Sequence, residues 1–402
     1  MVIKGSKLTY TLTFGALEYN ENNRTVFKSE LTGDDFIVEI MYTFSDVPLV
    51  LKGKARVGDV AEIVAYPHRI EMYINGKLTD EEWPAGTFKG KDFSNIGFGK
   101  VRDITVDEDA PMPCVLGEFE NAEGWRPADN VFVGDCMPYV SKGRYHVLYL
   151  KDRRHHQSKW NLGAHQWEHI STGDFVKWQI HPTAVKITDP KEASVCTGSW
   201  IEHCGKEYLF YTIRPCMASE KATICRSVSY DGYNFKKDRA FGFTLSDKYN
   251  VNHARDPKIF KGEDGLYHML ITTAKADCGS GCLMHLVSDN LDNWQELEPI
   301  YVASKELDEP ECPDYFVLDG TYYLVYSHFG RARYMYSDNP FDGWKVPKDP
   351  FVPCEGVPKA GIFNGRLIFT GFKRIDGYAG TLTFAEATKK ENGELVFAEL
   401  KY

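Results

Sequence analysis

The chain has 402 residues, a formal net charge of −10 and a hydrophobic fraction of 43%, which allows one large all-β domain plus a smaller one, or two to three ordinary domains. The acidic balance argues against binding to nucleic acid, and no apolar stretch approaches the roughly 20 residues that span a bilayer. The first ten residues, MVIKGSKLTY, lack the apolar core of a secretory signal, so we expect a soluble, cytoplasmic protein without a membrane partner.

Residues 1–108 have the pattern of a separate β-rich unit. Segments such as FIVEIMYTF (36–44) and HRIEMYINGKL (68–78) are rich in strand-forming residues, and Asn75-Gly76 is a hairpin signal. We predict an N-terminal β-sandwich here, and residues 68–83 resemble the jelly rolls of the concanavalin and laminin-G type. The acidic, proline-containing segment DEDAPMP (107–113) is the expected linker.

Residues 109–402 contain a repeat of β-strands. Five apolar, tyrosine-rich segments recur, each follows another strand, and four are followed by a polar turn and an aromatic residue. The segments are residues 145–150, 207–212, 266–273, 322–327 and 366–372, and the aromatic residues are Trp178, Phe235, Trp294 and Trp344. Self-similarity at roughly 45 to 60 residues without helical periodicity predicts a β-propeller. The expected fold class is therefore all-β, with a five-bladed β-propeller at 109–402 behind the β-sandwich.

Ten cysteines are spread along the chain. Because no secretory signal is seen, we expect reduced thiols rather than disulfides. Cys278 and Cys282 in CGSGC could be half of a metal site, but no second pair stands at zinc-finger spacing. A glycine-rich loop with two free thiols is the simpler interpretation, and we predict no metal.

Three of the predicted inner strands open with an acid: Asp135 in blade one, Asp256 in blade three and Glu311 in blade four. The first strand of each blade lines the central channel of a propeller, so these carboxyl groups are expected to converge. The corresponding residues of the other blades are Thr197 and Ser199 in blade two and Lys359 in blade five.

Converging carboxyl groups raise one another's pKa, so that one acid can stay protonated beside an ionised one. Such a pair is the equipment for glycoside hydrolysis. The alternative is structural: each acid caps a strand end or pairs with Arg255 or His253.

The motifs GD…P (134–138), RDP (255–257) and EC (311–312) resemble those of clan J glycoside hydrolases, above all glycoside hydrolase family 32, the invertases, inulinases and levanases. The resemblance covers residues from about 125 to 375 and includes WNLGAHQWEHISTGDFVKW (160–178), CTGSW (196–200) and GIFNGRLIFTGF (361–372). It implies that Asp135 is the nucleophile, that Asp256 holds sugar hydroxyls at the transition state and that Glu311 is the acid/base. No metal or organic cofactor is needed for this chemistry.

The resemblance also implies substrate contacts. Trp160 and Trp167 would offer apolar faces to sugar C–H groups, with blade packing as the alternative for each. Arg255 would orient a carboxylate or contact a hydroxyl. The remaining expected substrate-binding residues lie in the matching motifs and are His165, Thr197, Ser199 and Cys312.

The sequence departs from the family pattern around the nucleophile. The usual W-M-N-D-P-N-G is replaced by FVGDCMPYV (132–140), and Leu150 stands where the family has a glutamine. The basic and histidine-containing segment 151–160 is then either a solvated loop or a rebuilt sugar pocket. The family's C-terminal sandwich is missing, while a sandwich is predicted at the N-terminus.

We expect a retaining exo-glycoside hydrolase of the β-fructofuranosidase type, whose partner is a small fructose-containing oligosaccharide. Three alternatives stay open: a related furanosidase such as an arabinofuranosidase, a fructosyltransferase, and a carbohydrate-binding propeller without activity. A separation of about 5 to 5.5 Å between the two carboxyls indicates retention of configuration, and one of about 6.5 to 9.5 Å indicates inversion.

Overall fold

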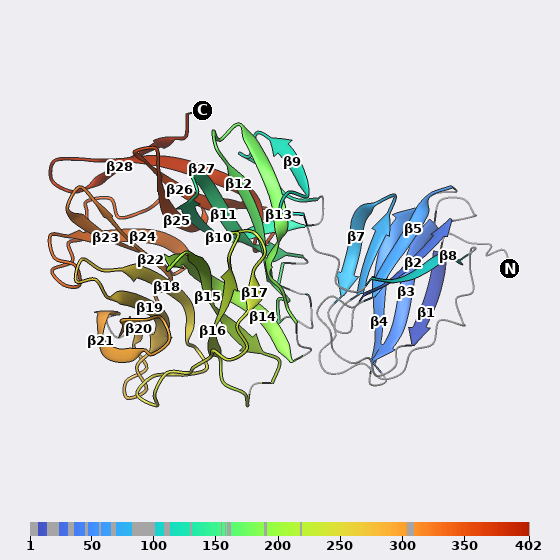
Figure 1. The fold of residues 1–402 in the computed structure, drawn as a ribbon, viewed down its shortest axis with the longest axis horizontal. Helices are drawn as coiled ribbons and strands as arrows, with labels where there is room; N and C mark the ends of the chain where they lie inside the picture. Colours follow the sequence, from blue (N-terminus) through green and yellow to red (C-terminus); the bar gives the residue numbers. More distant parts are fainter. Residues whose placement is uncertain are drawn as a thin grey trace.

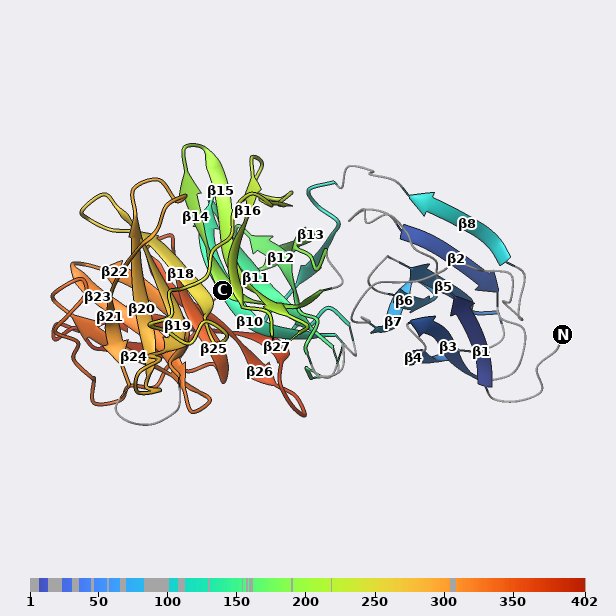
Figure 2. The same cartoon turned by 90° about the horizontal axis from the view of Figure 1, so that it is seen from below.

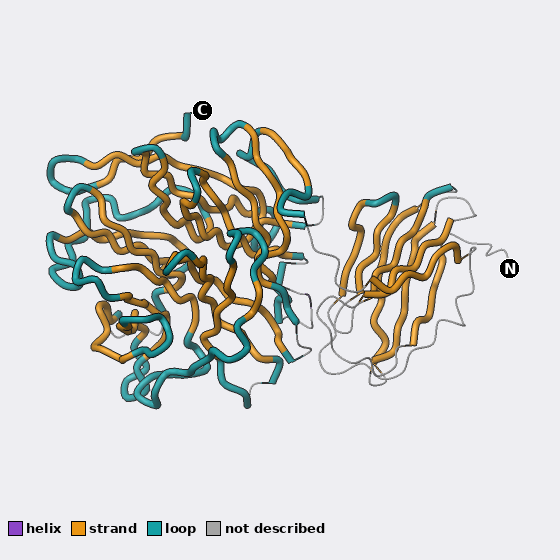
Figure 3. Tube along the Cα trace, viewed as in Figure 1, coloured by secondary structure: helices purple, strands orange, loops and turns teal. Residues whose placement is uncertain are grey.

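The computed structural model describes residues 7–13, 24–30, 36–44, 47–55, 58–65, 70–82, 101–107, 113–128, 131–153, 155–156, 158, 162–188, 191–217, 219–303 and 309–401. This part of the chain consists of β-strands joined by loops (Figure 3). Among these residues there is no helix with the length and apolar character of a membrane span.

The strands before residue 108 form two sheets, with the orders β1-β3-β4 and β7-β6-β5-β2-β8. Strand β4 lies against β6 and β7, which brings the two sheets face to face (Figure 2). The predicted Asn75-Gly76 turn joins β6 to β7, and both residues have positive φ. The bounds are β1 (Lys7–Thr13), β2 (Arg24–Glu30), β3 (Phe36–Phe44), β4 (Val47–Ala55), β5 (Val60–Ala65), β6 (Ile70–Ile74), β7 (Lys77–Glu82) and β8 (Val101–Asp107).

The later strands form five blades, numbered along the chain (Figure 1). Blade one contains β9 (Gly117–Glu120), β10 (Phe132–Ser141), β11 (Arg144–Asp152), β12 (Gln166–Thr172) and β13 (Lys177–Val185). Blade two contains β14 (Glu192–His203), β15 (Lys206–Pro215), β16 (Thr223–Ser229) and β17 (Lys236–Lys237), and blade three contains β18 (Arg255–Lys261), β19 (Tyr267–Ala274), β20 (Gly281–Ser288) and β21 (Gln295–Val302). Blade four contains β22 (Glu311–Leu318), β23 (Thr321–His328) and β24 (Arg331–Ser337), and blade five contains β25 (Gly356–Phe363), β26 (Arg366–Arg374), β27 (Gly380–Lys389) and β28 (Leu395–Glu399).

The five blades close into a ring, as the repeat predicts. Each inner strand contacts the next in the order β10, β14, β18, β22, β25, and β25 contacts β10 again. Apolar side chains fill the space between every pair of neighbouring blades, in five separate buried clusters. One of these clusters joins blade five to blade one, packing Phe372 and Leu382 with Val133 and Tyr149. The burial of this apolar surface holds the ring shut.

A two-residue irregularity near the start of each inner strand shapes the centre of the propeller. In all five blades the pairing with the second strand shifts at this point, for example between Val133 and Cys136 in β10 and between Arg255 and Lys258 in β18. Such bulges redirect the side chains beside them. The residues at these shifts therefore face the channel rather than the blade interior.

A group of ion pairs connects the N-terminal sheets to blade one. Lys151 Nζ lies 3.4 Å from Glu81 Oε2, and Arg153 Nη2 lies 3.6 Å from Asp80 Oδ1. Arg153 also donates a hydrogen bond of 3.0 Å to the carbonyl of Thr79. These contacts join β7 to Lys151 at the end of β11 and to Arg153 just after it.

Candidate active site

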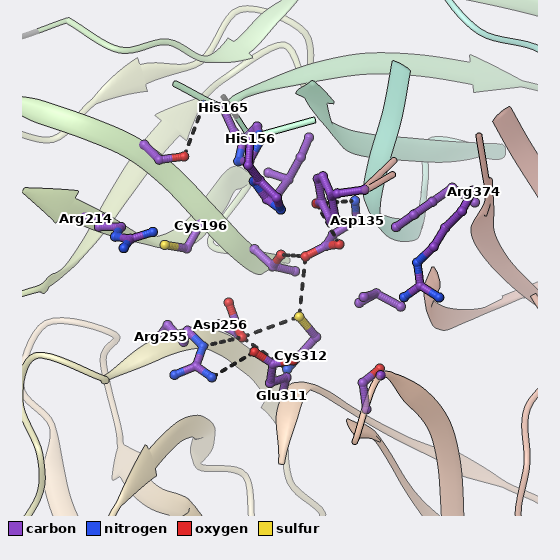
Figure 4. Close-up of a pocket in the computed structure, with 18 of the residues that line it drawn as sticks. Asp135, His156, His165, Cys196, Arg214, Arg255, Asp256, Glu311, Cys312 and Arg374 are labelled. Carbon is purple, nitrogen blue, oxygen red and sulfur yellow. Dashed lines mark hydrogen bonds and ion pairs between the residues drawn. The ribbon is translucent and has the colours of Figure 1, made fainter. Parts of the chain in front are cut away.

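Residues of the bulges line a cavity of about 320 Å³ between the inner strands (Figure 4). Its wall includes all three predicted catalytic acids, together with His165, Thr197, Arg255 and Cys312 from the predicted substrate-binding set. The three acids do not occupy equivalent positions in their strands. By pairing register Glu311 corresponds to Arg255, and Asp135 corresponds to Pro257, so the acids stand at three successive positions of the repeated bulge.

Asp135 is buried and held by hydroxyl groups from two different blades. Thr197 in β14 donates to Oδ2 at 2.5 Å, and Tyr378 in the β26–β27 loop donates to Oδ1 at 2.9 Å. Burial, followed by the charge of Asp135, raises the pKa of Tyr378 well above its usual value, so that the phenol remains a donor. The carboxylate is therefore fixed in orientation before any ligand arrives.

Cys312 bridges the first two acids. Its Sγ lies 3.5 Å from Asp135 Oδ2 and 3.4 Å from Asp256 Oδ2, and its backbone N–H donates to the same Asp256 oxygen at 3.1 Å. Burial raises the pKa of the Cys312 thiol well above its usual value, with further increases from the two acids. The sulfur thus acts as a neutral donor between two carboxyl groups.

Burial raises the pKa of Asp256 to about 6. The charge of Arg255 opposes this increase, while Glu311 and Asp135 add to it. Asp256 is thus a buried carboxyl group that titrates close to neutral pH, as expected for acids crowded in a cleft.

Arg255 arranges the acidic groups at the cavity mouth. Its Nη2 donates to Glu311 Oε1 at 2.9 Å, its Nη1 donates to Glu309 Oε2 at 2.5 Å, and its Nε lies 3.6 Å from Asp256 Oδ2. Glu311 keeps 48% of its side chain exposed, in contrast to the buried Asp135 and Asp256. One guanidinium group therefore holds the exposed Glu311 next to the buried Asp256.

The segment after β11 forms part of the site wall. Asp152 is fully buried and accepts hydrogen bonds from the backbone N–H groups of His155 and His156 and from His165 Nε2. His156 in turn stacks on Tyr378 with ring centroids 3.7 Å apart. The segment therefore supports the tyrosine that holds the candidate nucleophile, and Asp152 itself does not line the cavity. Asp152, His156 and His165 also place one potential metal-ligand atom each within 4.8 Å of one another.

Two residues that were predicted to contact the substrate lie between blades instead of at the cavity. Trp167 is fully buried in the cluster between blades one and two, and its Nε1 donates to the carbonyl of Cys196 at 3.0 Å. Ser199 joins blade two to blade three by donating to Pro257 O and accepting from Ile259 N, both at 2.8 Å. Both residues therefore serve blade packing rather than the cavity wall. Trp160 lies outside the described residues.

Other residues of the cavity wall are not among the predicted site residues. They are Ser194, Cys196, Arg214, Ser327, Arg374 and Tyr378, with Gly330 and several apolar neighbours. His156 also lines the cavity and belongs to segment 151–160, for which a rebuilt sugar pocket is one of the two interpretations. Tyr378 belongs to IDGYAG, an Asp-Gly hairpin loop without a counterpart in the other blades. The Asp-Gly turn was visible in the sequence, but nothing in it indicated that this loop reaches blade one.

Three acids therefore converge on one cavity of a five-bladed propeller. The sequence of this propeller also matches the model of a known family. The model of the glycosyl hydrolases family 32 N-terminal domain matches residues 135–346, just over half of the chain. The chain belongs to glycoside hydrolase family 32. The match begins at Asp135 and includes Asp256 and Glu311, so the family's domain contains all three acids.

Curated relatives and solved structures agree with this family 32 assignment. A sucrose-6-phosphate hydrolase of Bacillus subtilis (strain 168) is 33% identical over 234 residues, which are 56% of this chain and 44% of the relative. The GH32 β-fructofuranosidase structure from Bombyx mori has a TM-score of 0.54 and 21% identity, covering 68% of this chain and 64% of its own. The chain spans about half the length of the curated relatives it matches.

The propeller alone also resembles a second family. A GH43 β-xylosidase/α-arabinofuranosidase from a compost microbial metagenome has a TM-score of 0.53 at 17% identity. The match covers 70% of this chain and 98% of that enzyme. At these identities, the similarity to the Bombyx mori enzyme and to the GH43 enzyme concerns the fold alone.

Proposed function

We propose that the protein is a retaining exo-glycoside hydrolase that releases a terminal fructose from small fructose-containing oligosaccharides. The observation that carries the proposal is the convergence of Asp135, Asp256 and Glu311 on one cavity in a family 32 propeller. A cavity of about 320 Å³ suits the end of a sugar chain better than the middle of a polymer.

Asp135 is the proposed nucleophile. Its carboxylate attacks the anomeric carbon while the bond from that carbon to the glycosidic oxygen breaks, and Glu311 gives a proton to the departing oxygen. Glu311 then takes a proton from water, the water oxygen attacks the same carbon, and Asp135 leaves as a carboxylate. The partial exposure of Glu311 supports its role, since it must meet first a leaving group and then water.

Asp256 and Arg255 are the proposed binding pair for the fructosyl unit. The ionised Asp256 accepts hydrogen bonds from sugar hydroxyls that strengthen as the oxocarbenium-like transition state forms. Arg255 holds Glu311 beside it and balances the negative charge of the site. Thr197 and Tyr378 donate to Asp135, which fixes the orientation of its carboxyl group.

The second sugar of the proposed substrate carries an anionic group. Arg214 and Arg374 line the cavity from blades two and five, and neither guanidinium forms an ion pair with another described residue. Several curated relatives are named sucrose-6-phosphate hydrolases, which supports a phosphorylated sugar as the natural substrate. Arginine matches the geometry of phosphate oxygens particularly well.

A substrate screen tests the proposal. Purified full-length protein is incubated with sucrose, sucrose 6-phosphate, inulin-type and levan-type oligosaccharides, difructose dianhydrides and aryl arabinofuranosides. We expect release of fructose, with a higher kcat/KM for sucrose 6-phosphate than for sucrose and a loss of that preference in Arg374→Ala. Carbon NMR of the anomeric centre in the first-formed product should show retention.

The remaining candidates correspond to other outcomes of the same screen. Hydrolysis of the aryl arabinofuranoside with inversion would identify an inverting furanosidase and refute the proposal. Fructose transfer to a second sugar at low sugar concentration would identify a transferase. Sugar binding without turnover, unchanged in Glu311→Gln, would identify a carbohydrate-binding propeller.

A further inference from the structure

Blade one contains a cluster of three histidines that is separate from the cavity. His146 lies on β11, His169 on β12 and His181 on β13, so three consecutive strands contribute one imidazole each. All three side chains are at most 2% exposed. One ring nitrogen from each lies within 4.8 Å of the other two. The catalytic proposal above makes no use of this cluster.

Backbone carbonyls orient two of the three rings. His146 Nε2 lies 3.3 Å from the carbonyl of Ser141, and His181 Nδ1 lies 2.6 Å from the carbonyl of Cys114. A carbonyl only accepts hydrogen bonds, so these nitrogens carry the proton and the opposite nitrogens keep their lone pairs. Histidine ligands of metal ions typically donate their second N–H to a backbone carbonyl in this way.

The third ring has an unsatisfied nitrogen. His169 Nδ1 is buried without a hydrogen-bond partner among the described residues, while His169 Nε2 lies 2.9 Å from His146 Nδ1. Buried polar atoms without partners are rare in folded proteins and call for an explanation. His169 Nε2 also lies 3.2 Å from the Tyr139 hydroxyl. If His169 Nε2 bound a metal ion, the proton of this ring would move to Nδ1, so the unpartnered Nδ1 is not itself the ligand atom.

The nitrogen spacing is close to that of a metal site. Two nitrogens on one tetrahedral Zn²⁺ lie roughly 3.3 Å apart when each Zn–N bond is about 2.0 to 2.1 Å long. The pair His146 Nδ1 and His169 Nε2, at 2.9 Å, needs to open by only about 0.4 Å. His181 Nε2 now accepts from the Ser171 hydroxyl at 2.7 Å. The same hydroxyl accepts from Arg144 Nε at 2.9 Å, so a bound ion must displace it from His181.

Blade three provides an internal comparison. His268 and His285 form the same nitrogen contact, 2.9 Å from His268 Nδ1 to His285 Nε2, on the equivalent strands β19 and β20. His169 of blade one is paired in register with His181, whereas His285 of blade three is paired with Leu297. The two-histidine contact is therefore common to both blades, and blade one alone adds a third ligand.

We propose that His146, His169 and His181 bind one divalent transition-metal ion such as Zn²⁺. The ion fastens the three strands β11, β12 and β13 to one another and serves stability rather than the hydrolytic reaction. Imidazole nitrogen is a preferred ligand of Zn²⁺ and its neighbours in the transition series.

Metal titration of the full-length protein tests the proposal. The protein is unfolded with EDTA and then refolded, because a metal ion can reach or leave the buried cluster only when the blade opens. The refolded protein is titrated with Zn²⁺ and, separately, with Co²⁺. We expect one equivalent of bound ion, a Tm that rises with Zn²⁺ concentration, and a Co²⁺ absorption spectrum without thiolate charge-transfer bands. The wild-type result alone can refute the proposal: no stoichiometric binding, or a spectrum with thiolate bands from the cysteines, overturns it.

Two matched variants locate the site. His181→Leu copies the residue that blade three uses, and His285→Gln alters the two-histidine pair. Because loss of an outer partner already costs about 10- to 100-fold in metal affinity, loss of a ligand should cost roughly 100-fold or more. We expect this loss in His181→Leu and unchanged affinity in His285→Gln. Equal affinity of His181→Leu and the wild type would refute the assignment.

Discussion

At the scale of single residues, Asp135 is the part of the site that departs most from the family motif and is also the most firmly held. Thr197 and Tyr378 occupy both of its carboxylate oxygens, and Cys312 contacts one of them. The asparagine and tryptophan that the resemblance leads one to expect beside the nucleophile are absent from FVGDCMPYV (132–140). We propose that Asp135 keeps the nucleophile's role with different supporting contacts.

Replacing Asp135 by Ala should remove turnover of every substrate, activated or not, because no carboxylate remains to form the covalent intermediate. Asp152→Asn is the control, since Asp152 is buried behind the loop and supports Tyr378 only indirectly. We expect measurable kcat in Asp152→Asn. Comparable activity of Asp135→Ala and the wild type would exclude Asp135 as the nucleophile.

Replacing Glu311 by Gln should slow hydrolysis of natural sugars by roughly 10² to 10⁴, because an amide cannot donate the proton that a poor leaving group needs. The loss should be smaller for an aryl fructofuranoside, whose phenolate leaves without help. Initial rates on both substrates give the comparison. An equal loss on both would identify Glu311 as a binding residue.

The raised pKa of Asp256, about 6 against an ordinary 3.8, makes this residue a cost to stability at neutral pH. Between these two values the folded state binds more protons than the unfolded state, so stability falls as pH rises through this window. Asp256→Asn should therefore raise the free energy of unfolding at pH 7 by on the order of 1 to 3 kcal/mol, and Tm should rise with it. Activity should fall. The gain should disappear as the pH is lowered to about 4. Thermal melts of both proteins from pH 4 to 8 test this, and a gain that grows toward pH 4 contradicts it.

At the scale of elements, the repeated bulge of the inner strands determines which side chains reach the cavity. The sequence repeat predicts the five blades and the strands that line the channel. It does not predict the register, because a two-residue shift in pairing leaves no mark in the apolar pattern. For this reason Asp135, Asp256 and Glu311 were expected at one position and occupy three successive ones.

The same limit explains the residues that sequence reasoning missed or misplaced. Trp167 has the residue type of a sugar platform, but its position between two blades buries it completely. Tyr378 reaches the site from a loop more than 200 residues after Asp135, and only ring closure brings the two together. Local sequence can indicate a residue's chemistry, whereas these contacts depend on how blade one meets its neighbours.

A substitution at Gly134 tests whether the bulge of β10 positions Tyr378 on Asp135. A Cβ atom there would lie 2.7 Å from the Tyr378 hydroxyl and 3.2 Å from the Leu150 Cβ. Gly134→Ala should push Tyr378 off Asp135 and lower kcat by up to roughly 10²-fold, since small misplacements in an active site are costly. Tyr378→Phe is the matched variant, and the effects of the two changes should not add because both break one hydrogen bond. Kinetics of the two single variants and the double variant measure this, and full additivity would refute the shared cause.

At the scale of the whole molecule, we propose that residues 1–108 and 109–402 are two domains that pack on each other. The ion pairs from Glu81 and Asp80 to Lys151 and Arg153 support this arrangement. They reach the end of β11 and the start of the loop after it, and this loop also contains His156 at the cavity wall. The N-terminal domain would thereby brace the active-site loop rather than bind a polymer.

Expression of residues 109–402 alone tests this proposal. We expect a fragment with a lower Tm than the full chain, at about 2 to 4 °C for each kcal/mol of lost stability, and with weaker activity. The full-length double variant Asp80→Asn/Glu81→Gln should reproduce part of the loss, because it keeps the shape of the interface and removes its charge. A soluble fragment with undiminished Tm would argue against the packing.

The contact between Tyr378 and Asp135 has a consequence for the order of synthesis. The ribosome makes Asp135 243 residues before Tyr378, whose hydroxyl fixes it and which belongs to blade five. A nascent chain that has completed four blades therefore exposes the apolar faces of blade one and of blade four and has no finished catalytic centre. Activity should arise only after blade five has been made and has closed the ring, and chains shortened within blade five should be both inactive and prone to aggregation.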